Sequence, residues 1–173
     1  ISTIMLNVLL AINNTLNRVI LWLATIIVAL MVLALSLSAL TRYVSGIGYD
    51  WFIELPPVLT SWLVFPLLGP LLVQGKHIKV DFLTSILSDK SKTILRIFVA
   101  IVALMAGLIF CKAGIDATIL YYNLGQKMEL EIDVPIWWMY LAFPTGFLIL
   151  ILFSTQMFLE EILNLKNLKS KAD

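Results

Sequence analysis

The sequence has 173 residues, of which 61% are hydrophobic and 13% are charged. Its mean hydropathy of +0.99 lies well above the values of water-soluble domains. A net charge of +1 gives no basic surface that could follow a nucleic acid backbone. The composition therefore excludes a soluble globular domain and a nucleic-acid-binding protein, and it predicts a membrane protein.

The first 17 residues place apolar side chains at three- and four-residue spacing, with most polar side chains elsewhere around a helical wheel. This pattern predicts an amphipathic helix that lies in the membrane interface. The alternative is a simple N-terminal extension of the first membrane span, and the sequence leaves both open. The apolar positions are Ile1, Ile4, Met5, Val8, Leu9, Ile12 and Leu16.

Four apolar segments follow along the chain, each long enough for an α-helix to cross about 30 Å of hydrocarbon. We expect an all-α membrane protein with one domain over residues 1–173. The first span lacks a small-residue cleavage pattern, so we expect a retained helix and not a signal peptide. The predicted spans are about 19–41, 52–75, 94–120 and 134–162, joined by loops over 42–51, 76–93 and 121–133.

Lysine and arginine are distributed unequally between the two ends of these spans. The positive-inside rule places the lysine-rich end in the cytoplasm, so both termini and the 76–93 loop are expected there. Eight of the ten Trp and Tyr residues flank the other two loops, which supports the same orientation. The basic residues at the cytoplasmic end are Lys76, Lys79, Lys90, Lys92, Arg96, Lys166, Lys169 and Lys171, against Arg42 and Lys127 at the outer end.

The stretch GKHIKVDFL, residues 75–83, contains the single histidine of the chain. If this stretch is helical, His77 and Asp81 share one face because they are four residues apart. A metal or catalytic site would need further ligands, and none is near in the sequence. We interpret the stretch as a structural clasp at the cytoplasmic membrane surface, in which Asp81 accepts hydrogen bonds while Lys76 and Lys79 contact lipid phosphates.

Two charged pairs stand out near the predicted spans. Lys112 and Asp116 lie one helical turn apart inside the third span, where an isolated charge is costly. We interpret them as a self-neutralised pair that could face a partner helix, and the alternative is an ion or proton relay. Arg42 and Glu54 flank the first outer loop and are predicted to form a clamp between the first two helices.

The second span contains four prolines. Two of them are predicted to occupy the first turn of the helix, where no intrahelical N–H bond is lost. The other two each remove a hydrogen bond from the helix interior, so the helix is expected to bend there. Broken helices mark substrate sites in some transporters, but no paired repeat accompanies this one, which favours a structural kink. The positions are Pro56 and Pro57, then Pro66 and Pro70.

Catalytic and redox motifs are missing from the sequence. It contains no phosphate-binding loop, no HExxH and no GxSxG motif. Cys111 is the single cysteine, which excludes an internal disulfide and a Cys-x-x-Cys redox or zinc motif. We therefore expect a protein that is not an enzyme and that carries no cofactor of its own.

Four stretches together carry a family resemblance: TRYVSG (41–46), DWFIEL (50–55), LVFPLLGPLLVQGKHIKVDFL (63–83) and DVPIWWMYLAFPTGFLILIL (133–152). In their order and spacing the chain resembles the small membrane subunit, DctQ, of tripartite ATP-independent periplasmic (TRAP) transporters, over nearly its whole length. The residues that match the motifs of this family are Arg42, Tyr43, Trp51, Glu54, Gly69, Gly75, His77, Asp81, Pro135, Trp137, Pro144 and Gly146.

The resemblance implies a scaffold subunit in the cytoplasmic membrane of a bacterium or archaeon. Its partners would be a large many-helix subunit of the DctM type, which holds the substrate and sodium sites and moves as an elevator, and a periplasmic solute-binding protein loaded with an organic acid. A phospholipid could fill the interface between the membrane subunits. Two alternatives stay open, a self-sufficient small transporter and a membrane redox or metal subunit that uses His77 and Asp81.

Overall fold

The computed structural model describes residues 2–74, 88–128 and 133–170, and it is almost entirely helical. Four of its helical segments are long and apolar enough to cross a membrane, which confirms the predicted all-α membrane fold. Two short strands, which the sequence did not predict, lie between the third and fourth spans. The elements are α1 (Ser2–Ser45), α2 (Trp51–Val73), α4 (Asp89–Leu124), β1 (Lys127–Met128), β2 (Val134–Pro135), α5 (Ile136–Tyr140) and α6 (Ala142–Ser170).

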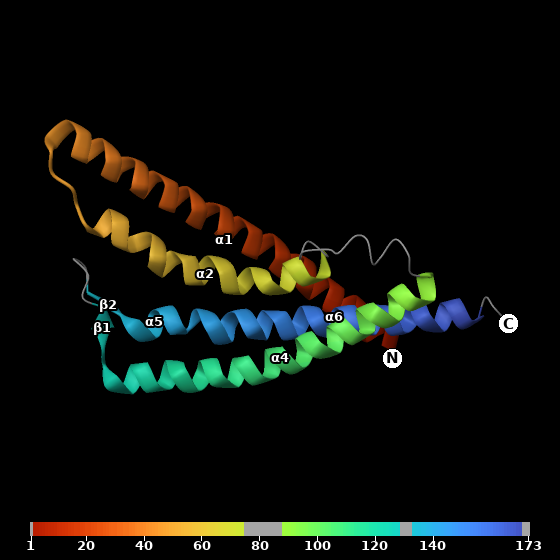
Figure 1. Ribbon diagram of the computed structural model, residues 1–173. Coiled ribbons are helices and arrows are strands. Elements are labelled where there is room, and N and C mark those ends of the chain that lie inside the picture. The colour runs from red at the N-terminus through yellow and green to blue at the C-terminus, as the bar shows by residue number, and fades with distance from the viewer. Residues whose placement is uncertain (1, 75–87, 129–132, 171–173) are drawn as a thin grey trace.

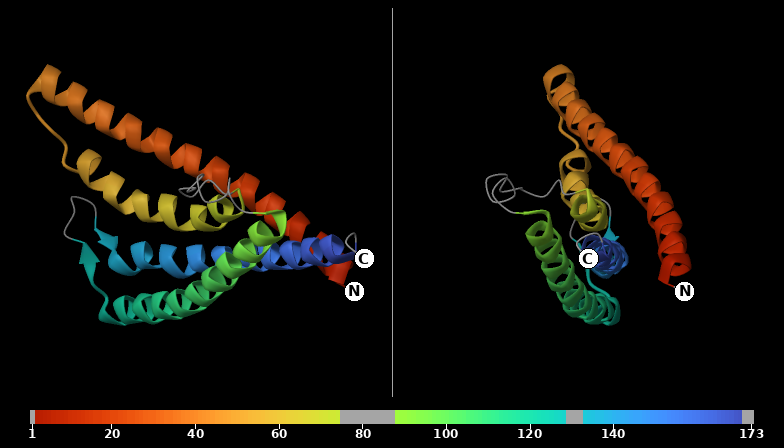
Figure 2. Two further views of the ribbon diagram at one scale, coloured as in Figure 1. Left: turned by 45° about the vertical axis from the view of Figure 1, so that its right-hand side comes forward. Right: turned by 90° about the vertical axis from the view of Figure 1, so that its right-hand side faces the viewer.

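The long helices stand in a row and not in a square bundle (Figure 1). The order across the row is α1, α2, α6 and α4, and each helix packs mainly on its neighbours in that order. The end-on view in Figure 2 shows α1 and α4 on opposite sides of α2 and α6. Both chain termini lie at one end, called the terminal end here, and the loop after α1 and the two strands lie at the other, called the hairpin end (Figure 1).

Helix α1 is continuous over 44 residues, about 66 Å at the usual helical rise. Its inward side follows a seven-residue repeat from the N-terminal part into the apolar part, which keeps one seam directed toward α2 and α6. The seam positions are Leu6, Asn13, Ile20, Ile27, Ala34 and Thr41. The N-terminal segment is therefore not separated from the first span by a break, and whether it lies in the interface stays a prediction.

Helix α2 also runs without a break, through four prolines. It begins at Trp51, so Pro56 and Pro57 lie in its second turn and not in the first turn as predicted. Pro66 and Pro70 remove the N–H groups that would bond the carbonyls of Trp62 and Pro66. Figure 1 shows α2 bowed along its length, as expected for a helix that lacks these bonds.

Helices α4 and α6 pack through a seam rich in small residues. The inward side of α4 repeats every three or four residues from Thr93 to Tyr121, which is the spacing of a coiled-coil seam. A Cβ added at Gly107 would lie 2.7 Å from Ile151 Cγ1, and one at Gly114 would lie 2.9 Å from Pro144 Cδ. The lack of a side chain at these two positions therefore favours the close approach of these two helices.

Part of the predicted loop over 121–133 is helix and strand. Helix α4 continues to Leu124 and ends at Gly125, whose φ of 61° is left-handed. The strands β1 and β2 then pair antiparallel, with Lys127 opposite Pro135. Helix α5 stops at Tyr140 because Pro144 has no N–H to donate to the Tyr140 carbonyl, and α6 continues in nearly the same direction (Figure 1).

Candidate functional site

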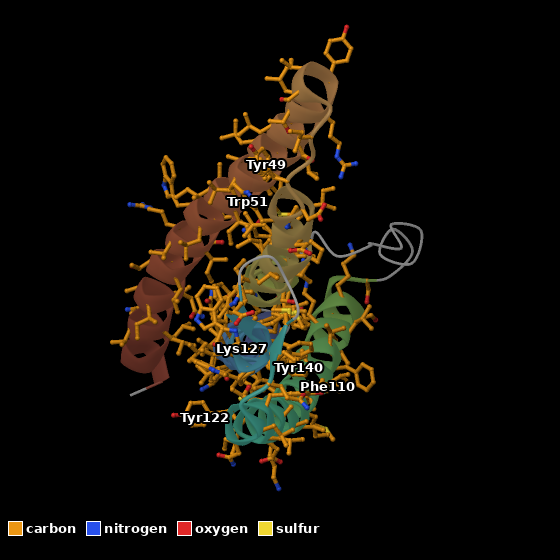
Figure 3. All side chains as sticks on the ribbon, turned by 90° about the vertical axis from the view of Figure 1, so that its left-hand side faces the viewer. Tyr49, Trp51, Phe110, Tyr122, Lys127 and Tyr140 are labelled. Atoms are coloured by element: carbon orange, nitrogen blue, oxygen red, sulfur yellow. The ribbon has the colours of Figure 1, made fainter. Side chains whose placement is uncertain are left out.

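Aromatic side chains join α4 to α5 and α6 at the hairpin end. The rings of Tyr121 and Tyr140 stack with centroids 4.3 Å apart, and their hydroxyl oxygens are 3.4 Å apart. Tyr122 meets Trp137 edge to face at 5.7 Å. Figure 3, viewed from the hairpin end, shows Tyr122, Tyr140 and Lys127 on this side, with Tyr49 and Trp51 around the first loop. Aromatic rings at one depth are typical of the membrane interface.

A small pocket opens beside this aromatic region, between the start of α2 and the start of α5. Its volume of about 140 Å³ is too small for a metabolite-sized ligand but can hold one apolar side chain. Beside the pocket, Trp62 Nε1 donates to the Trp138 carbonyl at 3.2 Å and so links α2 to α5. Glu54 is the one charged residue of the lining, which consists of Trp51, Glu54, Leu55, Val58, Leu59, Val134 and Trp138.

A buried amide anchors α1 to α6 at the terminal end. The Asn13 side chain is 1% exposed, and its Nδ2 donates to the Leu152 carbonyl at 3.3 Å and to Gln156 Oε1 at 2.7 Å. Gln156 Nε2 in turn donates to Glu160 Oε1 at 2.9 Å. Because both acceptors of Asn13 lie on α6, the amide fixes where α1 crosses that helix.

An ion pair joins α4 to α6 at the same end. Arg96 Nη1 donates to Glu161 Oε1 at 3.0 Å, and the side chains are 62% and 8% exposed. The carboxylate is thus largely buried while the guanidinium reaches solvent or headgroups. A buried carboxylate requires such a donor, since removing it would leave a desolvated charge. Asn17 and Gln74 add a further contact, from α1 to α2, at 3.2 Å.

The structure does not bring Arg42 and Glu54 together as predicted. The described residues show no ion pair between these two side chains. Arg42 is exposed and folds over its own loop, where a Cβ added at Gly48 would lie 2.5 Å from its Nε. Gly48 has no side chain, which gives the guanidinium room to take this position.

Lys112 and Asp116 are exposed on α4, on the side that faces away from α6. They lie one turn apart, as predicted, but no ion pair joins these two described side chains.

Trp51 is the first residue of α2 and stacks on Phe52 with ring centroids 3.9 Å apart. The predicted clasp, Lys76, His77, Lys79 and Asp81, lies outside the described residues.

Sequence reasoning missed the polar contacts at the terminal end. Asn13 occupies a position of the seven-residue seam, so this repeat could have indicated its burial. No local signal could have indicated the Arg96–Glu161 pair, because its members are 65 residues apart. Across residues 2–74, 88–128 and 133–170, no three His, Cys, Asp or Glu side chains gather as metal ligands would.

The fold and these contacts define a multi-pass helical membrane protein whose interhelical contacts are apolar in the middle and polar at the terminal end. The family model for the DctQ component of tripartite ATP-independent periplasmic transporters matches residues 31–164. The chain belongs to this family, which consists of transporter components and is not an enzyme class. A comparison with curated proteins finds no match.

Proposed function

We propose that this chain is the stationary scaffold subunit of a sodium-coupled TRAP importer of organic acids. It would lie in the cytoplasmic membrane of a bacterium or archaeon with both termini in the cytoplasm. Membership of the DctQ family supports a role as the small subunit beside a DctM-type large subunit and a solute-binding protein. The row of helices supports the stationary role.

The observation that carries this proposal is the apolar middle of the row. Where α2 meets α6, Gly69 lies against Phe153 and Ile149, and Gly146 lies against Phe65. These contacts are apolar, and Ser154, buried beside Phe153 on α6, donates its hydroxyl to the Leu150 carbonyl within its own helix. A solute pathway through a membrane is lined by polar or ionisable groups, so the pathway would belong to another subunit.

A row suits the support of a moving domain better than a square bundle does. A square bundle hides most of its apolar surface inside, whereas a row presents two broad faces and two edges to its surroundings. An elevator motion needs a wide fixed wall against which the mobile domain slides. Four long helices that add such a wall to the fixed part of the large subunit would widen its footprint in the bilayer.

The hairpin end is the proposed site that helps receive the solute-binding protein. It carries the exposed Lys127–Asp133 ion pair, with Nζ and Oδ2 3.1 Å apart, and the pocket beside Trp138. Exposed polar groups next to a pocket for one apolar side chain suit a transient protein contact. This assignment also agrees with the positive-inside orientation, which places the hairpin end outside.

Reconstitution tests the proposed function. The chain, the DctM-type subunit of the same organism and the solute-binding protein are placed in liposomes, and uptake of a labelled organic acid is measured with and without a sodium gradient. We expect uptake that requires all three proteins and the gradient. Uptake by the chain alone would instead support the self-sufficient transporter, and unchanged uptake without the chain would refute the scaffold role.

A further inference from the structure

The far face of α4, defined as Ile94, Phe98, Met105, Ile109, Lys112, Asp116 and Ile119, runs along one edge of the row. These residues recur mostly at three- and four-residue steps on the side opposite the seam with α6, and all are exposed. Met105 and Ile109 are 59% and 63% exposed. Helices α1 and α2 lie on the other side of α6 and cannot cover this face (Figure 2).

The two charges of this face lie at the depth of the hydrocarbon. Tyr121 and the aromatic side chains around it mark the interface at the hairpin end. Lys112 precedes Tyr121 by nine residues and Asp116 by five, which places their Cα atoms about 14 Å and about 8 Å further in. Half of the hydrocarbon thickness is about 15 Å, so Lys112 lies near the middle of the bilayer.

The rest of the described chain leaves these charges uncompensated. The ion pairs found among the described residues are Arg96–Glu161 and Lys127–Asp133. Neither pair includes Lys112 or Asp116. Lipid chains offer no hydrogen bonds, so charges at this depth almost always face a protein group or a water-filled cavity in membrane proteins. The apolar residues above and below them, Met105, Ile109 and Ile119, favour a packed helix over a water-filled cavity.

We propose that the far face of α4 is the docking face for a membrane-spanning helix of the large TRAP subunit. That helix would place a carboxylate or carbonyl acceptor opposite Lys112 and a hydrogen-bond donor opposite Asp116, with apolar side chains along the remainder. The inference rests on the proposed function, because it requires the large subunit. A second copy of this chain fits less well, because two parallel copies related by a two-fold axis bring like charges closest together.

Photo-crosslinking in the intact complex tests the position of the partner. A benzophenone amino acid replaces Met105 or Ile109 on α4, and Leu33, which is 58% exposed on α1, serves as the matched control. The chain is co-expressed with the DctM-type subunit, irradiated in membranes and examined for crosslinked bands. We expect a crosslink to the large subunit from α4 at least tenfold stronger than from Leu33. A band between two copies of this chain, or lipid adducts alone, would overturn the proposal.

Charge removal tests the chemistry of the contact. Lys112→Leu combined with Asp116→Leu should reduce the co-purified large subunit at least tenfold, while the thermal midpoint of the isolated chain is not lowered because both side chains are exposed. The control, Lys127→Leu with Asp133→Leu, removes the same two charges from an exposed pair at the hairpin end. Equal recovery of the large subunit with both double variants would refute the charge contact.

These outcomes separate the two proposals. If the unaltered chain does not co-purify with the large subunit, the proposed function fails and the docking face fails with it. If the unaltered chain does co-purify and drives uptake, but the α4 variants behave like their controls, only the docking face is wrong. The crosslinking arm keeps both charges in place, so it stays informative even if the double variant is poorly expressed.

Discussion

Replacing Gly146 with alanine should destabilise the protein although alanine favours helices. Gly146 lies on α6 directly opposite the backbone of α2. A Cβ added there would lie 2.5 Å from the Cβ, carbonyl carbon and carbonyl oxygen of Phe65. Ordinary van der Waals contact requires about 3.5 Å or more, so α2 and α6 would have to separate by roughly 1 Å.

The size of the effect follows from two opposing contributions. Overpacking a tight contact costs about 1–3 kcal/mol, and the upper part of this range applies because backbone atoms cannot rotate away. Alanine in place of glycine gains about 0.5–1 kcal/mol within a helix. We therefore expect the free energy of unfolding to fall by about 2 kcal/mol, which lowers the thermal midpoint by roughly 4–8 °C. The separation would also disturb the contact of Phe65 with Phe143, whose tilted rings have centroids 4.0 Å apart.

Thermal unfolding in detergent, followed by tryptophan fluorescence, measures this change. Trp62 and Trp138 report on the affected region because their ring centroids are 6.0 Å apart across α2 and α5. Gly107→Ala is the matched control, since the clash there is with the movable Ile151 side chain, and we expect its midpoint to change by less than half as much. A midpoint for Gly146→Ala at or above that of the unaltered protein would show that the close contact between α2 and α6 does not form.

Three further predictions concern the terminal end. Asn13→Asp should lower the thermal midpoint more than Asn13→Leu, because a carboxylate would face two acceptors on α6, one of them Gln156 Oε1; a smaller loss for the aspartate would contradict the observed hydrogen bonds. Arg96→Ala should cost about 1–2 kcal/mol, more than Glu161→Gln, which keeps an acceptor for the guanidinium; losses that simply add in the double variant would argue against the ion pair. In a cysteine-free background, Asn14→Cys should react with a water-soluble maleimide much faster than Asn13→Cys, and similar rates would contradict the buried seam of α1.

The number and type of the main elements could be predicted from the sequence because each span is an apolar segment between charged residues. The strands β1 and β2 could not be predicted in the same way, since strands of two residues carry no periodic pattern. The start of α2 was predicted at about residue 52, one residue after its observed start at Trp51, where the Asp50 carbonyl accepts from the N–H groups of Ile53 and Glu54.

The order of the helices in the row was out of reach for sequence reasoning. Apolar residues occupy every side of α1 and α4, so composition does not reveal which side faces another helix and which side faces lipid. The small residues of α4 indicate which side of this helix packs on another helix. Gly107 and Gly114 lie seven residues apart on one side, and they mark the seam with α6 because close helix contacts in membranes select small side chains.

The two edges of the row, α4 and α1, differ in how they are attached to the helices between them. The α4 edge is closely packed, since glycines bring α4, α6 and α2 into close contact along their apolar lengths. The α1 edge is anchored by polar contacts at the terminal end, and α1 leans away from α2 toward the hairpin end (Figure 1). A wall that must resist the motion of a large subunit should bear that load where its helices pack most tightly. The edge with the closest helix contacts is also the edge that carries Lys112 and Asp116, so packing and charge both favour the proposed partner position on α4.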